Sequence, residues 1–193
     1  MLENLSQYKL ILASASPRRK ELLKGLEVDF EVRLIENIDE SYPSTLQGEA
    51  IPLAIAKKKT AAYLPTLAEN ELLLTADTIV WIDGKVLGKP KDEADAIATL
   101  THLSGKKHQV ITGVCLSTQK KERSFTVVSS VLFASLTAEE IAYYVNKYKP
   151  FDKAGGYGIQ EWIGYIGVEA IEGSYFNVMG LPIQRLYQEL KQF

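Results

Sequence analysis

The sequence is poor in the residues that build disulfide frameworks and zinc sites. Its 193 residues include one cysteine, Cys115, and two histidines, His102 and His108. A single cysteine cannot form an internal disulfide, which fits a reducing compartment, and two histidines argue against a histidine-rich zinc site. Because Cys115 lies in an apolar alternating segment, we expect it to be a buried core thiol.

Long hydrophobic runs and a large charge imbalance are missing as well. No stretch approaches the roughly 18 consecutive apolar residues of a membrane span, and residues 1–9 lack the basic start and apolar region of a signal peptide. The net charge is -2 and the pI is about 5.8, so no overall positive field attracts a nucleic acid polymer. We therefore expect a cytoplasmic protein that binds neither membranes nor nucleic acid polymers.

The chain contains no internal repeat, low-complexity tract or Pro/Gly/Ser linker that would separate independent domains. Hydrophobic residues make up 46% of the sequence, which is enough for a real core. Helical and strand patterns are interleaved along the chain. They predict one α/β domain over residues 1–193, with a mixed twisted sheet, flanking helices and two lobes around a central cleft.

An apolar run that stops at two serines and turns basic, residues 10–20, predicts a strand, a tight loop and a helix start. Ser16 can cap this helix, which extends to about Lys24, and Pro17 suits its first position. Arg18 and Arg19 fall in the first turn, where the helix dipole disfavours cations, and a bound anion would remove that conflict. Taken alone, this stretch fits a phosphate site and a capped helix with solvated arginines equally well.

The most informative carboxylate is Asp77, because apolar strand residues flank it on both sides. Burial without partners would cost several kcal/mol, so Asp77 either bonds backbone groups or binds a metal and acts as a base; we favour the second interpretation. Three acids also cluster in residues 36–40, after a predicted strand over residues 30–35. That cluster is typical of a solvated loop or of a metal site.

Other sequence patterns predict the elements on which further polar residues lie. A helix over about residues 51–64 carries Lys57-Lys58-Lys59, of which at most one or two can face a common site, since consecutive helical residues point about 100° apart. Asp83-Gly84 predicts a hairpin that returns to Gly88-Lys89-Pro90, and Thr137 to Glu140 form a capping box. Residues 152–160 form a glycine-rich turn, which lets a ligand approach the backbone closely. We expect a strand over 163–171, a loop over 177–181 and a closing helix over 182–191.

Together these residues suggest phosphate-ester chemistry. Glu40 and Asp77 supply hard oxygen ligands suited to Mg²⁺ or Mn²⁺. The candidate cations for several phosphates are Arg18, Arg19, Lys59, Lys89 and Lys153.

Six motifs, in order, resemble those of the Maf family of nucleoside triphosphate pyrophosphatases, named for an association with septum formation. They are Ser14-Ala15-Ser16-Pro17-Arg18-Arg19, Ala76-Asp77-Thr78-Ile79-Val80, Gly88-Lys89-Pro90, Leu103-Ser104-Gly105, residues 152–160, and Val178-Met179-Gly180-Leu181-Pro182. The resemblance runs from about Lys9 to Lys191. It implies a fold similar to the inosine triphosphate pyrophosphatases and divalent-cation-dependent hydrolysis between the α- and β-phosphates.

The resemblance also implies individual roles. Asp77 matches the catalytic base, and it would hold the metal together with Glu40, for which Asp39 is an alternative. Ser14, Arg18, Arg19, Lys59, Lys89 and Lys153 match phosphate-contacting positions. Arg18, Thr78 and Gln160 match the triplet of the subgroup acting on dTTP and UTP, where the Gln160 amide could both donate to and accept from a pyrimidine edge.

Three functions stay open from the sequence. The first is a dTTP/UTP pyrophosphatase, and the second is a nucleotide-binding regulator of cell division in which catalysis is incidental. The third is an enzyme that removes modified pyrimidine triphosphates. The family resemblance and the aromatic residues from Tyr143-Tyr144 to Trp162 also suggest a homodimer.

Overall fold

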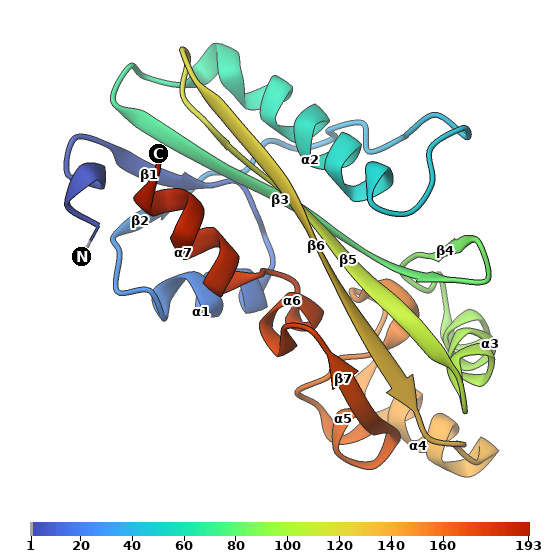
Figure 1. Ribbon diagram of the computed structural model, residues 1–193. Coiled ribbons are helices and arrows are strands. Elements are labelled where there is room, and N and C mark those ends of the chain that lie inside the picture. Colours follow the sequence, from blue (N-terminus) through green and yellow to red (C-terminus); the bar gives the residue numbers. More distant parts are fainter. Residues whose placement is uncertain (1) are drawn as a thin grey trace. The chain divides into compact units, whose positions relative to one another are not determined.

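The computed structural model describes residues 2–193 (Figure 1). Its strands are β1 (Lys9–Leu12), β2 (Phe30–Val32), β3 (Glu71–Ile82), β4 (Lys85–Leu87), β5 (Lys107–Ser117), β6 (Glu122–Phe133) and β7 (Val168–Glu172). Its helices are α1 (Pro17–Lys24), α2 (Ala50–Tyr63), α3 (Glu93–Leu103), α4 (Ala138–Tyr148), α5 (Trp162–Gly167), α6 (Tyr175–Met179) and α7 (Ile183–Lys191). Short 3-10 turns occupy Glu3–Leu5, Leu64–Thr66 and Ala154–Gly156. None of these helices is long and apolar enough to cross a membrane.

The chain divides into two compact units, each built from several segments. The first unit contains the chain up to Thr78, Thr112–Val127 and Gly180–Phe193, and the second contains Ile79–Ile111 and Val128–Met179. Strands β3, β5 and β6 contribute residues to both units. The predicted α/β architecture with a mixed sheet is confirmed, since the sheet contains both parallel and antiparallel pairs.

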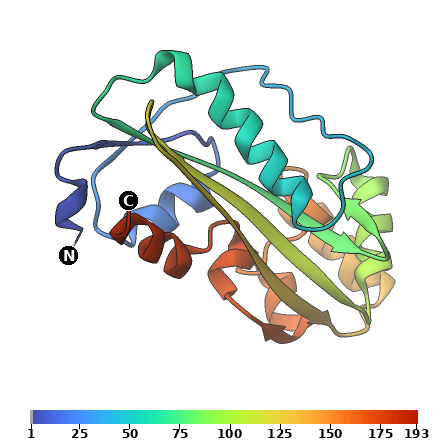
Figure 2. The same cartoon turned by 45° about the horizontal axis from the view of Figure 1, so that its top comes forward.

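In the first unit, β1 pairs in parallel with β2 and β3, and neighbouring strands follow in the order β2-β1-β3-β5-β6. Helix α2 covers one face of this part of the sheet, and α1 and α7 cover the other (Figures 1 and 2). The first turn of α2 packs so closely on β5 that a Cβ added at Gly113 would lie 2.5 Å from the backbone of Pro52 and Leu53. Because side chains alternate between the two faces of a strand, each β3 side chain in this unit points either toward α2 or toward the face covered by α1 and α7.

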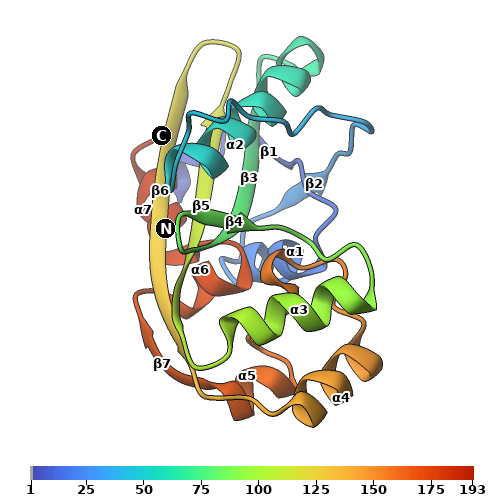
Figure 3. The same cartoon turned by 90° about the vertical axis from the view of Figure 1, so that its right-hand side faces the viewer.

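In the second unit, β3 and β4 form the predicted hairpin, with Val80 opposite Leu87. Asp83 and Gly84 both have positive φ, 52° and 73°, as a two-residue hairpin turn requires. Strand β7 pairs antiparallel with β6, and α3 packs against α4 (Figure 3). The core of this unit includes Leu100, Phe133, Tyr144 and Ile163.

Several elements begin where the local sequence predicts. The Ser16 side chain accepts a hydrogen bond from the Arg19 N–H and Pro17 starts α1, as predicted. The capping box of Thr137 and Glu140 is complete. Strands β5 and β6 are adjacent in the sheet, and Cys115 is buried, as predicted.

The predicted strand over 163–171 is wrong in its first half. Residues 162–167 form α5, and only 168–172 form a strand. Ile163 and Gly167 are buried while Tyr165 is 81% exposed, which is the spacing of a helix rather than of a strand.

The predicted loop over 177–181 is wrong over 177–179, because α6 occupies Tyr175–Met179, and it is confirmed only at 180–181. The Ser174 hydroxyl accepts the Asn177 N–H at 3.2 Å, and the buried Asn177 amide donates to the Val110 carbonyl and the Ser129 hydroxyl. Val110 and Ser129 are distant from Asn177 in the sequence, so local patterns do not indicate these contacts.

Candidate active site

Strand β3 carries the central carboxylate. The sequence predicts apolar strand residues on both sides of Asp77, and in the structure both sides belong to one continuous strand, β3 (Glu71–Ile82), with Asp77 within it. Because side chains alternate along a strand, Asp77 and Thr75 share the face covered by α2, where the Thr75 and Thr60 hydroxyls are 2.7 Å apart. The Asp77 side chain is only 14% exposed.

Lys59 on α2 connects Asp77 with Glu40. Its Nζ donates to Asp77 Oδ1 at 2.9 Å and lies 3.0 Å from Glu40 Oε1. The neighbouring lysines point elsewhere, Lys57 toward Glu122 and Lys58 toward Asp39. This arrangement confirms that helical rotation brings only part of the lysine run to one place.

The contacts of Asp39 separate it from Glu40. Both Asp39 oxygens accept hydrogen bonds, from the Ser41 N–H at 2.9 Å, the Ser41 hydroxyl and the Lys58 ammonium. These partners, chiefly Lys58, hold the pKa of Asp39 well below its usual range. Glu40, the other candidate for the second carboxylate, is the residue that reaches Lys59.

The donor set around Lys59 fits a hard divalent cation. Glu40 and Asp77 converge on one ammonium, so their carboxylates lie near each other. Residues 2–193 contain no group of three or more His, Cys, Asp or Glu side chains arranged to hold a metal. Two carboxylates suit Mg²⁺, which commonly keeps waters and takes its other ligands from substrate phosphates rather than from an all-protein cage.

Arg19 approaches β3 from the opposite face. Its guanidinium donates to the Ala76 carbonyl at 2.8 Å, the Thr78 hydroxyl at 3.0 Å and the Gly180 carbonyl at 2.8 Å. Burial lowers the pKa of Arg19, and nearby Asp77 opposes that shift. Three of its five N–H groups are therefore engaged by the protein, on both sequence neighbours of Asp77 and on Gly180.

The remaining predicted site residues of the first unit are Ser14 and Arg18, at or just before the start of α1, and Thr78, which contacts Arg19. The Ser14 hydroxyl is buried and accepts the Ser16 N–H at 3.2 Å, and Arg18 is half-buried in the first turn of α1. The Thr78 hydroxyl, besides its bond with Arg19, lies 2.9 Å from the Thr112 hydroxyl and 3.3 Å from the Gly180 carbonyl. Thr78 is thus saturated by protein groups.

The second unit holds a separate cluster around the glycine-rich turn. Lys153 is 8% exposed, and its Nζ lies 2.8 Å from Asp152 Oδ1 and 3.1 Å from Glu161 Oε1. Gly155 and Gly156 adopt positive φ of 69° and 68°. The Gly155 N–H donates to the Gly88 carbonyl at 3.0 Å, which brings the exposed Lys89 segment next to the turn.

Gln160 is the last residue of this turn and carries an unsatisfied atom. Its Oε1 is buried and has no hydrogen-bond partner within residues 2–193. A buried acceptor without a partner costs free energy, so this oxygen is available to a donor from outside the chain, a ligand or a water. Beneath the turn, His108 Nε2 and the Tyr157 hydroxyl are 2.7 Å apart, and burial lowers the pKa of His108 to about 4.

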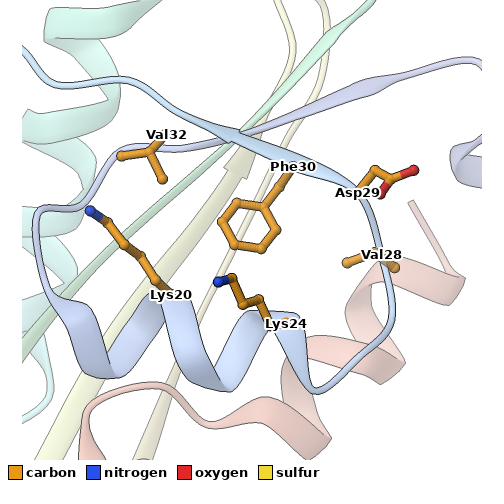
Figure 4. Close-up of a pocket in the computed structure, with 6 residues that line it drawn as sticks. All are labelled: Lys20, Lys24, Val28, Asp29, Phe30 and Val32. Carbon is orange, nitrogen blue, oxygen red and sulfur yellow. The ribbon is translucent and has the colours of Figure 1, made fainter.

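A cavity of about 400 Å³ lies elsewhere in the first unit (Figure 4). Lys20 and Lys24 of α1 and Phe30 and Val32 of β2 line it, together with Val28 and Asp29. None of the predicted site residues contributes to its lining.

Comparison with known proteins gives the family of the chain. The family described as Maf-like protein matches residues 9–193. The chain belongs to the Maf family. Proteins called dTTP/UTP pyrophosphatase from Parabacteroides distasonis and Phocaeicola vulgatus are 63% and 64% identical to it, over 100% of both chains in each case. The similar protein from Porphyromonas gingivalis is 53% identical over 100% of this chain and 98% of its own.

The Maf chain also shares its fold with a solved structure. The Staphylococcus aureus Ham1 protein matches with a TM-score of 0.55 and 17% identity, over 94% of this chain and 99% of that chain. At that identity the match concerns the fold alone, and it confirms the expected α/β architecture.

Two contacts of this Maf chain are not predicted from its sequence. Glu161 reaches Lys153, and the Tyr144 hydroxyl binds Glu161. Tyr144 is 0% exposed, so its ring belongs to the core. No periodicity marks the hydroxyl of a core tyrosine as a partner of a distant carboxylate, so only the structure reveals this link.

Proposed function

We propose that this chain hydrolyses dTTP and UTP to the monophosphate and pyrophosphate. The observation that carries the proposal is its full-length similarity, at 63–64% identity, to relatives called dTTP/UTP pyrophosphatase. The ion pairs of Lys59 with Asp77 and Glu40 support it independently, because paired carboxylates beside a cation suit hydrolysis of a phosphoanhydride.

In this proposal Asp77 is the general base. Its Oδ1 accepts from Lys59, which leaves Oδ2 to orient a water and take its proton. Lys59 keeps the carboxylate in one orientation from α2. Asp77 and Glu40 would hold a Mg²⁺ or Mn²⁺ ion, which when bound polarises a phosphate oxygen.

The cations would stabilise the triphosphate and the departing pyrophosphate. We assign this role to Arg18, Lys89 and Lys153, with the hydroxyl of Ser14 and the backbone at the start of α1 as further donors. Arg19 has two N–H groups left for a phosphate. Two of its protein contacts support a second role as well, because they hold the Ala76 carbonyl and the Thr78 hydroxyl, on either side of Asp77 in the sequence.

Recognition of the base is assigned to Gln160, with Arg18 and Thr78. The unpaired Oε1 of Gln160 can accept from the ring N–H that thymine and uracil share, while its amide donates to an adjacent carbonyl. Because the Thr78 hydroxyl is engaged by Arg19 and Gly180, we assign it to positioning of these groups rather than to contact with the base.

A pyrophosphate-release assay tests the proposal. The panel contains dTTP, UTP, CTP, ATP and GTP with two modified pyrimidine triphosphates, at fixed Mg²⁺. We expect the highest kcat/KM with dTTP, UTP or their modified forms. Tight binding with negligible turnover would favour the regulator of cell division, and preference for purine triphosphates would contradict the role of Gln160.

We also propose that the chain acts as a homodimer in the cytoplasm, with residues 1–193 as one Maf domain. The homodimer is supported by exposed aromatic side chains of the second unit, which a second subunit would cover. They are Tyr143, Tyr165, Tyr175 and Phe176. Tyr144 is fully buried and does not contribute. Analytical ultracentrifugation should give a dimer for the wild type and a monomer for Tyr165→Lys; a monomeric wild type contradicts this part of the proposal.

A further inference from the structure

Lys153 is the only buried lysine among the described residues, and its ammonium lies between two carboxylates. A buried ammonium requires a partner of opposite charge. Two carboxylates face it, but they differ in environment: the Asp152 side chain is 58% exposed, whereas that of Glu161 is 20% exposed. Since solvent screens the exposed pair, Glu161 is the stronger anchor.

Glu161 is itself held from several directions. The hydroxyl of Tyr144, on α4, donates to Glu161 Oε2, and the Glu161 N–H donates to the Gly158 carbonyl at 2.9 Å. A Cβ added at Gly158 would lie 2.8 Å from Glu161 Cδ, so this glycine leaves room for the carboxylate. The Glu161 side chain therefore has little freedom to move away from Lys153.

Tyr144 joins this carboxylate to the glycine-rich turn. Its hydroxyl also accepts the buried Gly158 N–H at 3.0 Å, and its ring stacks on Tyr148 with 5.0 Å between centroids. Burial, and then the bond to Glu161, raise the pKa of Tyr144, which keeps the hydroxyl protonated as a donor. One fixed hydroxyl thus sets the position of both the turn and the carboxylate.

We propose that Glu161, held by Tyr144, is a positioning residue that fixes the Lys153 ammonium for contact with the triphosphate of the substrate. The inference rests on the proposed function, in which Lys153 binds phosphate. It deepens that function, since the relevant carboxylate is neither a metal ligand nor a base. Its role is to hold a long, flexible side chain in one place at the moment of binding.

The sign of one substitution tests this role. Glu161→Gln retains the shape and an acceptor for Tyr144 but removes a negative charge. By charge alone, the loss should tighten binding of a polyanion; if Glu161 positions Lys153, binding should weaken instead. We expect Glu161→Gln to weaken inorganic triphosphate binding in calorimetry, and to lower kcat/KM with dTTP, by about 10-fold.

Matched variants make the result specific. Glu172→Gln removes a charge from an exposed ion pair with Lys107 in the same unit and should change neither measurement. In a Lys153→Ala background, Glu161→Gln should cause no further loss, because its effect passes through Lys153. Tyr144→Phe keeps the charge of Glu161 and removes its hydroxyl partner, so it should weaken triphosphate binding in the same direction, whereas Tyr148→Phe should not.

The outcomes separate the two proposals. Wild-type protein that binds inorganic triphosphate but releases no pyrophosphate from dTTP or UTP overturns the proposed function and leaves the Glu161 comparison decisive. Equal or tighter triphosphate binding by Glu161→Gln, or additive losses with Lys153→Ala, overturn the positioning role. If Glu161→Gln melts far below the wild type, Tyr144→Phe decides by the same criteria, and a wild type that binds no triphosphate overturns both proposals.

Discussion

Lys59 in the first unit and Lys153 in the second each bridge two carboxylates, but the two bridges are built differently. Lys59 lies on α2 and meets Asp77 on the continuous strand β3, so regular backbone hydrogen bonds define both ends of that contact. Lys153 lies at a glycine-rich turn, and the position of its partner Glu161 is defined by the Tyr144 hydroxyl and by the close approach of Gly158. The first bridge depends on secondary structure, and the second depends on side-chain contacts and on the absence of Cβ atoms.

The two bridges should therefore respond differently to substitution. Substitutions at the Lys59 bridge should alter chemistry while the fold survives, because the strand and helix exist without those side chains. Substitutions at the Lys153 bridge should alter stability and function together. Four predictions test this contrast, from the largest expected effect to the smallest.

Asp77→Asn should remove most activity with little change in melting temperature. The amide cannot take a proton from water, so we expect kcat with dTTP to fall by about 10²- to 10⁴-fold. Asp83→Asn, in the exposed hairpin turn, is the control and should keep wild-type turnover. Wild-type kcat in Asp77→Asn would remove Asp77 from the role of base.

Gly155→Ala should destabilise the second unit. Gly155 has a φ of 69°, and an added Cβ would lie 2.7 Å from Val80 Cγ2. We expect the free energy of unfolding in urea to fall by about 2–4 kcal/mol.

Gly84→Ala is the matched control for this glycine. Its φ of 73° is similar, but no atom lies within 4 Å of the added Cβ, so it should cost only about 1 kcal/mol. Equal losses in the two variants would mean that close packing does not shape the turn.

Glu40→Gln should impair activity more than Asp39→Asn. Glu40 reaches Lys59, whereas Asp39 is tied to Lys58 and Ser41. We expect Glu40→Gln to lower kcat/KM by about 10- to 100-fold and to raise the Mg²⁺ concentration needed for half-maximal rate. The reverse order of the two variants would make Asp39 the second carboxylate.

Acidification should destabilise the wild type through His108. Burial lowers the pKa of this histidine from 6.5 to about 4, so below pH 6.5 the unfolded chain binds a proton that the folded chain does not. Stability is therefore fully present above pH 6.5 and declines as the pH falls toward 4, by about 1–3 kcal/mol.

Variants of the two histidines isolate this effect. Urea unfolding of His108→Gln at several pH values should show a smaller loss over that range, although the variant starts from a lower stability at pH 7. His102→Gln, at an exposed position, should keep the wild-type dependence. An unchanged slope in His108→Gln would exclude this histidine as the source.

The correctly predicted parts of the fold depend on contacts between near neighbours in the chain. Ser16 and Pro17 start α1, Asp83-Gly84 forms the hairpin turn, and Thr137 caps α4, each through bonds within about four residues. The errors concern segments whose partners are remote. The sequence misassigns residues 163–167 and 177–179 because buried contacts with other parts of the second unit decide their conformation.

The candidate site divides in the same way. Residue types and motif order predict Asp77, Lys59 and Lys153 as site residues, since carboxylates and cations suit phosphate chemistry, and the resemblance to the Maf family adds Gln160. They did not reveal that Asp77 lies inside one strand, that Arg19 grips its neighbours from the other face, or that Glu40 rather than Asp39 meets Lys59.

By itself, the sequence determined the chemistry available and the local starts and turns of its elements, because capping, turn formation and strand alternation are short-range effects. Only the tertiary structure decided which polar groups pair. Lys59 meets Asp77 across 18 residues, and Tyr144 meets Glu161 across 17. Contacts at such separations depend on how helices pack on strands and on where a glycine leaves room, and no local pattern encodes those choices.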